Sequence, residues 1–442
     1  MILIVGAGPT GLAAAHELNS RGHTDWLLVE QSHEPGGLSG SINEAGYTWD
    51  HGGHVVFSHY EEFDKILNEL FEPEELIAHD RSSFVWIEGT WIPYPLQGNC
   101  HLLPEPTRSW AIRDALAAPG FEQHEGSTFN DYCINALGTT LTELFMRPYN
   151  KKVWTVDLTE LGTNWLGERV QGIDKDALKQ RIETGDPDIR WGPNNQFLFP
   201  ASGGTGEIWR RLDATLPTER KRYEVGLSRV DMNAKTAKLT NGQAVEYDQL
   251  IYTGPLNELC RRAKVPTELR DASRLLQWNS TFVVGVGVHG PVDDERSWLY
   301  FPEMAQPFYR ATNFTHYAES NSPAGTHSWM CEIGVSPALR NSADEEQMMS
   351  ETVAGLEQAG LIDHRDIAHV HSHWIERAYP LPTPMRDSAL DVIQPYLEEN
   401  DIYSRGRFGA WKYESQGNQD MAFTAGMDVV RRILDGSKER CA

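Results

Sequence analysis

The first thirty residues carry the feature that most restricts the fold of this chain. The apolar run Ile2 to Val5 indicates a buried strand, helical periodicity spans residues 12–21, and three glycines in the spacing G-x-G-x-x-G begin directly after the strand. These glycines are Gly6, Gly8 and Gly11. Such a turn lets the backbone approach a pyrophosphate at the amino end of the helix, where Thr10 stands. The pattern predicts a nucleotide-binding βαβ unit.

The sequence after this unit favours FAD over NAD. A second apolar stretch, Leu27 to Val29, ends at Glu30, where an acidic residue commonly meets a ribose hydroxyl. The glycine-rich stretch EPGGLSG then follows, which a plain NAD-binding domain does not need. Its residues Gly37, Leu38 and Ser39 bring further backbone N–H groups to a phosphate. We therefore expect an FAD site.

The remaining patterns predict an α/β fold with a discontinuous Rossmann-like FAD-binding domain. A helix expected from about Asp420 to Leu434 returns to the flavin unit, where its first turn faces an isoalloxazine carbonyl. Residues 308–317, FYRATNFTHY, read as a strand, and Asn241-Gly242 reads as a hairpin turn. The expected domains are 1–99, 200–264 and 386–442 for FAD binding, 100–190 as a helical substrate and gating insertion, and 191–199 with 265–385 as an antiparallel-sheet substrate domain.

Composition limits the partners of this chain. The formal net charge of -24 argues against nucleic acid, whose phosphates such a field repels. No apolar run approaches the roughly 20 residues that cross a bilayer, and no basic segment precedes the first apolar stretch. Five cysteines without C-x-x-C spacing indicate a reducing compartment. We expect a cytoplasmic protein without a membrane partner.

Three histidines alternate along a predicted strand in the stretch AHVHSH. His369, His371 and His373 should therefore point to one face of that strand. A metal site is the alternative interpretation, but no cysteine or carboxylate completes the set at short spacing, so we predict none. No carboxylate stands out as a general base either.

Longer stretches carry a resemblance to a known family. They include WDHGGHVVFSHYEEFDKIL, WIPYPLQGN, FMRPYNKKVW, NWLGERV and GRFGAWKYESQGNQD. The chain resembles the flavin-dependent UDP-galactopyranose mutases, and the eukaryotic type more than the shorter bacterial type. The resemblance implies an isomerase that interconverts the pyranose and furanose rings of a UDP-sugar through a covalent adduct with N5 of reduced FAD. It also implies NADPH or NADH as the reductant, and it leaves a homo-oligomeric state open.

Individual positions acquire expected roles from this resemblance. Arg310 and Arg407 match arginines that hold the substrate pyrophosphate, and His54 matches a mobile loop beside the flavin, so these three are the expected catalytic residues. The expected substrate contacts are Asn150, Trp154, Arg169, Asn194, Trp298, Tyr300, Arg310, Tyr317, Tyr379, Arg407, Tyr413 and Asn418. The expected cofactor contacts are Gly6, Gly8, Thr10, Gly11, Glu30, Gly37, Leu38, Ser39, Gly53, His54, Gly409, Asn418, Gln419 and Asp420.

Four of these residues also have a purely structural explanation. Arginines in an acidic protein often form ion pairs, which is the alternative for Arg310 and Arg407. Tryptophans often pack in a core, which is the alternative for Trp154 and Trp298.

Three departures from the family pattern keep other functions open. Trp86 and Ser202 stand where arginines near the flavin are expected, and one extra residue separates Tyr413 from Asn418. These changes put the flavin potential and the substrate in doubt more than the reaction class. The alternatives are an FAD-dependent oxidase or desaturase of the amine-oxidase or protoporphyrinogen-oxidase type, and a mutase relative acting on another nucleotide sugar.

Overall fold

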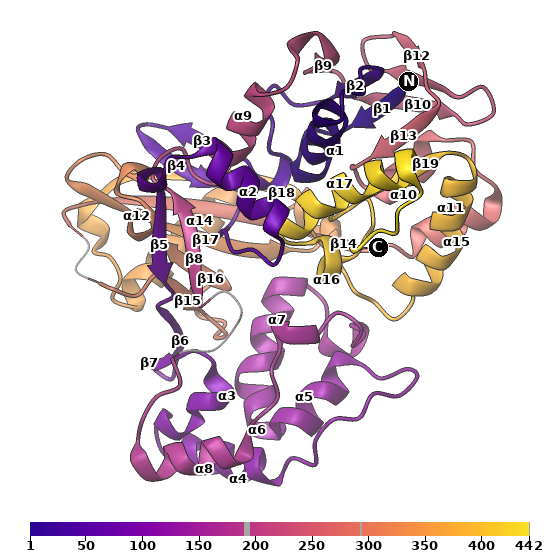
Figure 1. Cartoon of the computed structure of the whole chain (residues 1–442). Coiled ribbons are helices and arrows are strands. Elements are labelled where there is room, and N and C mark those ends of the chain that lie inside the picture. Colours follow the sequence, from indigo (N-terminus) through magenta and orange to yellow (C-terminus); the bar gives the residue numbers. More distant parts are fainter. Residues whose placement is uncertain (190–194, 292–293, 442) are drawn as a thin grey trace.

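The N-terminal strand lies in the middle of a parallel sheet that gathers strands from distant parts of the chain (Figure 1). The computed structural model describes residues 1–189, 195–291 and 294–441. The sheet has the order β19-β13-β1-β2-β9, with β1 Ile2–Val5, β2 Trp26–Val29, β9 Lys221–Arg222, β13 Gln249–Tyr252 and β19 Ile402–Ser404. All its neighbouring strands run parallel. The predicted discontinuous FAD-binding fold is confirmed.

The glycine turn connects β1 to α1, Pro9–Ser20, for the physical reasons that the sequence suggests. Gly6 has φ +108°, a conformation that side chains with a Cβ rarely adopt. A Cβ added to Gly11 would lie 1.9 Å from the carbonyl oxygen of Gly6, so the helix packs closer to the turn than another residue allows. Gly22 follows the helix with φ +69°, as a residue just beyond a helix end commonly does.

Helix α17, Gln419–Asp435, packs along α1, so two helices about four hundred residues apart lie side by side (Figure 1). A Cβ on Gly426 would lie 2.1 Å from the Thr10 carbonyl oxygen, which shows how closely the helices approach. The helix expected from Asp420 to Leu434 is therefore present, with its ends one residue further out on each side.

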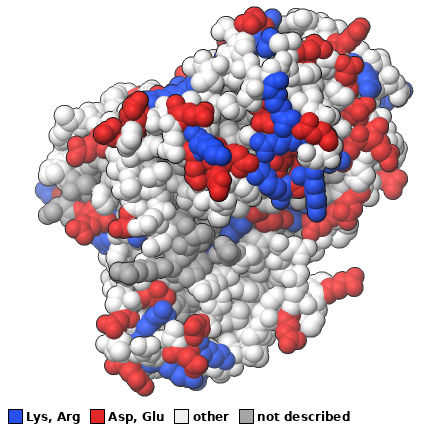
Figure 2. Space-filling view, viewed as in Figure 1, with Lys and Arg blue, Asp and Glu red and all other residues white. Residues whose placement is uncertain are grey.

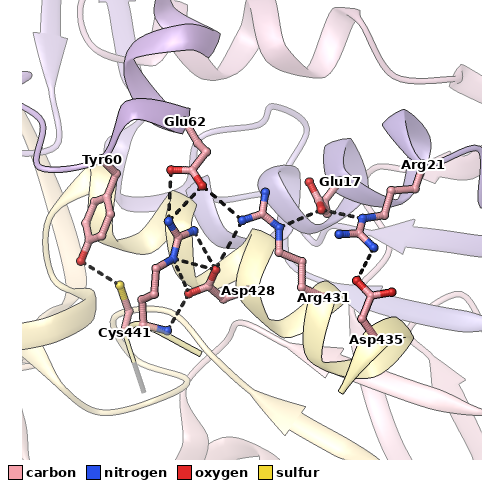
Figure 3. Close-up of polar contacts among 9 residues, drawn as sticks. Glu17, Arg21, Tyr60, Glu62, Asp428, Arg431, Asp435 and Cys441 are labelled. Carbon is pink, nitrogen blue, oxygen red and sulfur yellow. Dashed lines mark hydrogen bonds and ion pairs between the residues drawn. The ribbon is translucent and has the colours of Figure 1, made fainter. Parts of the chain in front are cut away.

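An ion-pair network fastens α17 to its neighbours (Figure 3). Arg431 donates to Glu17 of α1 at 2.9 Å and to Glu62 of α2, Glu61–Leu70, at 3.2 Å. Arg440 joins Glu62 at 2.9 Å and Asp428 at 2.8 Å. The amino end of the chain, α2 and the residues after α17 are thereby held as one unit.

A seven-stranded sheet forms the second layer of the molecule. Its order is β18-β14-β17-β16-β15-β6-β7, with β6 Ser83–Ile87, β7 Thr90–Pro93, β14 Trp278–His289, β15 Trp298–Tyr300, β16 Arg310–Asn313, β17 Thr326–Val335 and β18 Ile367–Pro380. Its neighbours are antiparallel except β15 and β6, which run parallel. Strands β6 and β7 fall within 1–99, although their sheet is otherwise built from later residues. The division into domains stays a prediction.

The stretch 308–317 differs from the predicted strand in its second half. Strand β16 ends at Asn313, and Phe314–Tyr317 form the one-turn helix α12. The Asn313 side chain accepts a hydrogen bond from the backbone N–H of His316, which satisfies a free donor of the first turn and favours the helix. The predicted hairpin turn at Asn241-Gly242 does lie between β11, Thr236–Leu239, and β12, Ala244–Glu246.

Helices occupy the insertion below both sheets, as expected (Figure 1). The main ones are α4 Thr107–Ala117, α5 Phe129–Leu137, α7 Arg147–Trp154 and α8 Lys175–Thr184. A π-helical turn, Thr142–Met146, leads directly into α7. In the described ranges, no helix has the length and apolar character to cross a membrane.

Candidate functional site

One cavity of about 1060 Å³ lies where the two sheets and α7 meet. Its wall combines the glycine turn of the parallel sheet, residues of β15, β16 and β18, and one face of α7. Because its volume exceeds the upper end of ordinary small-ligand pockets, roughly 1,000 Å³, it has room for a large ligand.

Two helices present uncapped amino ends to this cavity. The N-cap residues Gly8 of α1 and Asn418 of α17 make no side-chain capping bond. The first backbone N–H that returns to an N-cap carbonyl is that of Leu12 in α1 and that of Ala422 in α17. The earlier amides of each helix therefore remain for an anion or a carbonyl oxygen. This arrangement fits a dinucleotide whose pyrophosphate meets α1 and whose ring system meets α17.

Glu30 and the second glycine loop line the same end of the cavity. The Glu30 carboxylate accepts from the Ala7 N–H and from the Ser32 N–H, both at 2.7 Å, so it braces the glycine turn. Gly36 and Gly37 have φ +112° and +53°, and a Cβ on Gly37 would lie 3.3 Å from the Gly8 Cα. The two glycine-containing loops cross so closely that both can contact one ligand.

Guanidinium groups and phenol rings alternate along the opposite wall. Arg407 lies over the Tyr379 ring at 4.6 Å and the Tyr413 ring at 5.1 Å. Arg169 covers Tyr413 at 4.8 Å and donates to its backbone carbonyl at 3.2 Å. Within residues 1–189, 195–291 and 294–441, no carboxylate forms an ion pair with Arg169 or Arg407. This wall carries positive charge that is available to an anionic ligand.

Arg310 behaves differently, because a carboxylate pairs with it. Arg310 and Glu332 stand opposite each other on β16 and β17. Arg310 donates to the Glu332 carboxylate from both Nε and Nη2, each at 2.6 Å. Glu332 is buried and also accepts from the Gly53 N–H at 2.9 Å and from the Tyr309 hydroxyl at 2.7 Å. Burial alone would raise the pKa of Glu332, but Arg310 and these donors lower it. The ion-pair alternative thus applies to Arg310, which nevertheless lines the cavity.

His54 lies between these charges as a neutral imidazole. Burial, with a further contribution from Arg407, lowers the pKa of His54 to about 3. Its backbone N–H donates to the Gly52 carbonyl at 2.8 Å, and the adjacent Gly53 rests on Glu332. The loop that carries His54 is therefore positioned by the Arg310–Glu332 pair.

Most predicted site residues line the cavity. They are Gly6, Gly8, Thr10, Glu30, Gly37, Leu38, Ser39, Gly53, His54, Asn150, Trp154, Arg169, Trp298, Tyr300, Arg310, Tyr379, Arg407, Tyr413, Asn418, Gln419 and Asp420. Their contacts with substrate or cofactor stay predictions.

Three predicted residues, Tyr317, Gly11 and Gly409, are not among those that line the cavity. Tyr317 packs against Phe197 and Phe199 in the core, and because it lies seven residues after Arg310, an unbroken strand would also have placed it on the opposite face. Gly11 and Gly409 serve the backbone: a Cβ on Gly409 would lie 2.2 Å from the Arg405 carbonyl oxygen. Asn194 lies outside the described residues.

Arg81 and Glu332 are wall residues to which the sequence reasoning gave no role. Arg81 donates to the Tyr300 hydroxyl and its guanidinium lies 5.0 Å from the Trp298 ring. Arg81 follows a strand and belongs to no recognisable motif, so the sequence did not point to it. Glu332 had a weak signal, since it is the one acidic residue in the apolar stretch SWMCEIGV.

The departures at 86 and 202 lie away from the cavity wall. Trp86 packs against Trp91 with the two rings tilted and their centroids 4.8 Å apart, and neither Trp86 nor Ser202 lines the cavity. The expected loss of positive charge beside the flavin is therefore not located at these two positions.

On the surface, by contrast, acidic and basic side chains interleave (Figure 2). Figure 3 shows such pairing beside α17, where Arg21, Arg431 and Arg440 each meet a carboxylate. In a chain with net charge -24, Arg169 and Arg407 of the cavity wall stand apart from this pattern, because neither forms an ion pair with a described residue.

Comparison with known proteins agrees with this site. The model of the family of flavin-containing amine oxidoreductases matches residues 9–434. Protoporphyrinogen oxidase 2 of Arabidopsis thaliana, chloroplastic/mitochondrial, is 22% identical over 91% of this chain and 87% of its own length. A putative protoporphyrinogen oxidase from Exiguobacterium sp. 255-15 shares the fold, with a TM-score of 0.73 and 16% identity over 98% of both chains.

A crystal structure of reduced UDP-galactopyranose mutase is much more similar. It superposes with a TM-score of 0.95 and is 36% identical, over 99% of this chain and 94% of that one. The glycine turn, the two uncapped helix ends and the brace at Glu30 fit the FAD that this family holds. The chain thus belongs to the flavin-containing amine oxidoreductases and, within them, is a flavin-dependent enzyme of the UDP-galactopyranose mutase type.

Proposed function

We propose that the enzyme interconverts UDP-galactopyranose and UDP-galactofuranose in the presence of reduced FAD. The observation that carries this proposal is the wall of Arg169, Tyr413, Arg407 and Tyr379, which faces the same cavity as the two helix ends. Guanidinium and phenol groups suit a diphosphate, whereas the substrates of amine or tetrapyrrole oxidases carry no such group. The similarity to reduced UDP-galactopyranose mutase supports the same sugar and the reduced state.

The residues of the chain divide the work between binding and positioning. Arg407 and Arg169 hold the diphosphate. The rings of Tyr379 and Tyr413 orient the guanidinium planes of these two arginines. When bound, reduced FAD would supply a nucleophilic N5 for the proposed covalent route between the two sugar rings. His54, which is neutral because of its burial, can offer a hydrogen bond inside the cavity without adding a charge. NADPH or NADH is the proposed reductant.

A turnover experiment tests this function. The purified holoenzyme is incubated with UDP-galactofuranose and dithionite, and UDP-galactopyranose is measured by chromatography. We expect product under reducing conditions and none with the oxidised enzyme. Absence of product, together with reduction of the flavin by an amine or a tetrapyrrole precursor, would show that the chain is an oxidase.

Replacing Arg407 tests the phosphate wall. Arg407→Gln should weaken UDP binding about 10- to 150-fold, because it removes charge-assisted hydrogen bonds of roughly 1.5 to 3 kcal/mol. The thermal midpoint should stay close to that of the wild type, since no carboxylate in the described chain depends on Arg407. Titration calorimetry with UDP measures the affinity.

Arg365→Gln is the matched control for this measurement. Arg365 is an exposed arginine whose partner, Asp363, lies far from the cavity wall. Equal UDP affinity in Arg407→Gln and Arg365→Gln would mean that the phosphates bind elsewhere.

A further inference from the structure

Two rows of aromatic residues run side by side from the surface to the cavity. One row belongs to β4, Tyr47–Asp50, and the residue after it, and the other to β18. The pairs are Tyr47 with His369 at 5.6 Å, Trp49 with His371 at 5.7 Å, and His51 with His373 at 5.2 Å between ring centroids. Each row uses alternate residues, so all six rings share one layer, as predicted for the three histidines of β18.

Glycines in the neighbouring strand make room for this layer. Gly285 and Gly287 of β14 pair with His371 and His369. A Cβ on Gly285 would lie 2.6 Å from the Trp49 ring, and one on Gly287 would lie 2.3 Å from the Tyr47 ring. Any larger residue would push the β4 row off the sheet.

Two hydrogen bonds connect Glu44, His371 and His373. The half-exposed carboxylate of Glu44 lies 2.7 Å from His371 Nδ1, and His371 Nε2 lies 3.0 Å from His373 Nδ1. His51, the next ring, lines the cavity and places its Nδ1 3.1 Å from the Gly37 carbonyl oxygen. A row of titratable groups thus runs from the surface to the cofactor end of the cavity, hydrogen-bonded as far as His373 and completed by the ring contact between His373 and His51.

The acceptors at both ends fix where the protons lie. A carboxylate accepts, so His371 carries its proton on Nδ1 and its Nε2 accepts from His373 Nδ1–H. A carbonyl oxygen also accepts, so His51 carries its proton on Nδ1. His373 Nε2 is therefore a lone pair, and it is buried without a hydrogen-bond partner among the described residues. Nε2 of His51 is unprotonated as well. Neither His51 nor His373 therefore has an Nε2 proton to donate to the other, and one added proton would be needed to link them.

We propose that Glu44, His371, His373 and His51 form a proton path between solvent and the cavity. A proton that leaves the cavity binds His51 Nε2 and passes from there to His373 Nε2, while His51 keeps its Nδ1 proton towards the Gly37 carbonyl oxygen. His373 then passes its Nδ1 proton to His371 Nε2, and His371 passes its Nδ1 proton to Glu44, which releases it. His371 and His373 now hold their protons on Nε2, which is the arrangement that carries the next proton inward. One export therefore prepares one import, and the starting tautomers return.

The surroundings keep the three histidines of the path neutral in the resting enzyme. Burial, with His51 and His371 adding to it, lowers the pKa of His373 to about 3. Burial also lowers the pKa of His51 and of His371, the latter against the pull of Glu44. Further titratable groups beside the path are His369, 3.4 Å from Glu44, Tyr47, which stacks on His369, and His54, whose pKa His51 helps to lower. Neutral imidazoles are required at His371 and His373, because each of these two must accept a proton on one nitrogen while donating from the other.

The use of this path rests on the proposed function. Isomerisation takes a proton from one sugar hydroxyl and returns a proton to another, with no net change. An export followed by an import matches that balance, and the path remains open when a nucleotide sugar fills the cavity mouth.

Nitrogen NMR of the oxidised holoenzyme, labelled with ¹⁵N-histidine, tests the path without turnover or substrate. Single His→Gln variants assign the resonances. We expect His371 and His373 to carry their protons on Nδ1 and to leave Nε2 unprotonated. A proton on Nε2 of His373 in the resting enzyme would overturn the proposal.

Proton release measures the transfer itself. Ferricyanide oxidises the photochemically reduced holoenzyme: two ferricyanide ions take two electrons from reduced FAD, which loses one proton. An indicator dye follows the proton while absorbance follows the flavin. With UDP bound, we expect the two signals to coincide in wild type and in His369→Gln, which lies beside the path. In His373→Gln the proton should lag, and coincident signals there would overturn the path.

Failure of the proposed function is distinguishable in the same experiment. UDP binding is measured first by calorimetry with the oxidised holoenzyme. Absence of UDP binding contradicts the proposed function, and the NMR tautomers still decide the path on their own.

Discussion

Arg310→Met is expected to lower the free energy of unfolding by about 3 to 5 kcal/mol, because it leaves the buried Glu332 carboxylate without its cation. The substitution keeps most of the side-chain volume, so the loss comes from charge rather than from a cavity. Without Arg310, burial raises the pKa of Glu332, and the variant should be less destabilised at low pH. Denaturant unfolding of the holoenzyme measures the effect.

The double variant Arg310→Met, Glu332→Met distinguishes two contributions to stability: the interaction between the two charges, and the cost of burying one charge without its partner. Removing both charges should recover most of the lost stability, since apolar residues often replace a buried pair at little cost. The matched control is Arg365→Met, which breaks an exposed pair with Asp363 and should cost about 1 kcal/mol or less. A loss as small for Arg310→Met as for Arg365→Met would contradict the structural role of the pair.

This result would also separate the two cavity arginines. Arg407→Gln should impair UDP binding with little effect on folding, whereas Arg310→Met should impair folding first. Losing Glu332's partner also disturbs Gly53, whose N–H donates to that carboxylate, and with it the loop that carries His54.

Asp50→Asn is expected to remove a large pH dependence of stability. Asp50 is fully buried, and burial raises its pKa from 3.8 to about 7, against the hydrogen bonds from Ser41 and Thr205. The folded protein therefore holds a proton that the unfolded chain releases above pH 4. The stabilisation is complete below the unfolded pKa and is lost as the pH rises towards 7, by about 4 kcal/mol in total.

The measurement is the difference in unfolding free energy between wild type and Asp50→Asn from pH 5 to 8. We expect this difference to fall with rising pH and to level off near pH 7. Thr205→Val is the companion variant: its lost hydroxyl donated to the ionised carboxylate at 2.9 Å, so the levelling should move to higher pH. A pH-independent difference would show that Asp50 is ionised throughout.

The nucleotide-binding end of the fold was predictable from sequence because its determinants are local. The turn needs glycine at positions 6 and 11 for steric reasons that hold in any chain, and helical periodicity fixed α1 and α17 to within a few residues. The arginine–tyrosine wall came from the family resemblance, since Arg169 and Arg407 lie more than two hundred residues apart.

The missed features depend on pairing that one sequence does not reveal. Glu332 meets Arg310 through the register of β16 and β17, and a shift of one residue would separate them. Tyr317 was expected at the wall from the family resemblance alone, and alternation along a strand would have put it on the face opposite Arg310. Glu44 completes the histidine row from 327 residues away, so short spacing gave no sign of it.

The packing of α17 along α1 sets the order in which this protein can assemble. During synthesis the glycine turn emerges first, but the helix that covers its other side, and whose amino end completes the flavin pocket, emerges after residue 419. Contacts across such a separation form slowly, since a very long loop must close before they contribute. The seven-stranded sheet and the helical insertion are therefore available to fold while the cofactor unit is still open. We therefore expect FAD to bind late in folding, and until α17 has packed, the flank of α1 that it covers stays exposed to aggregation.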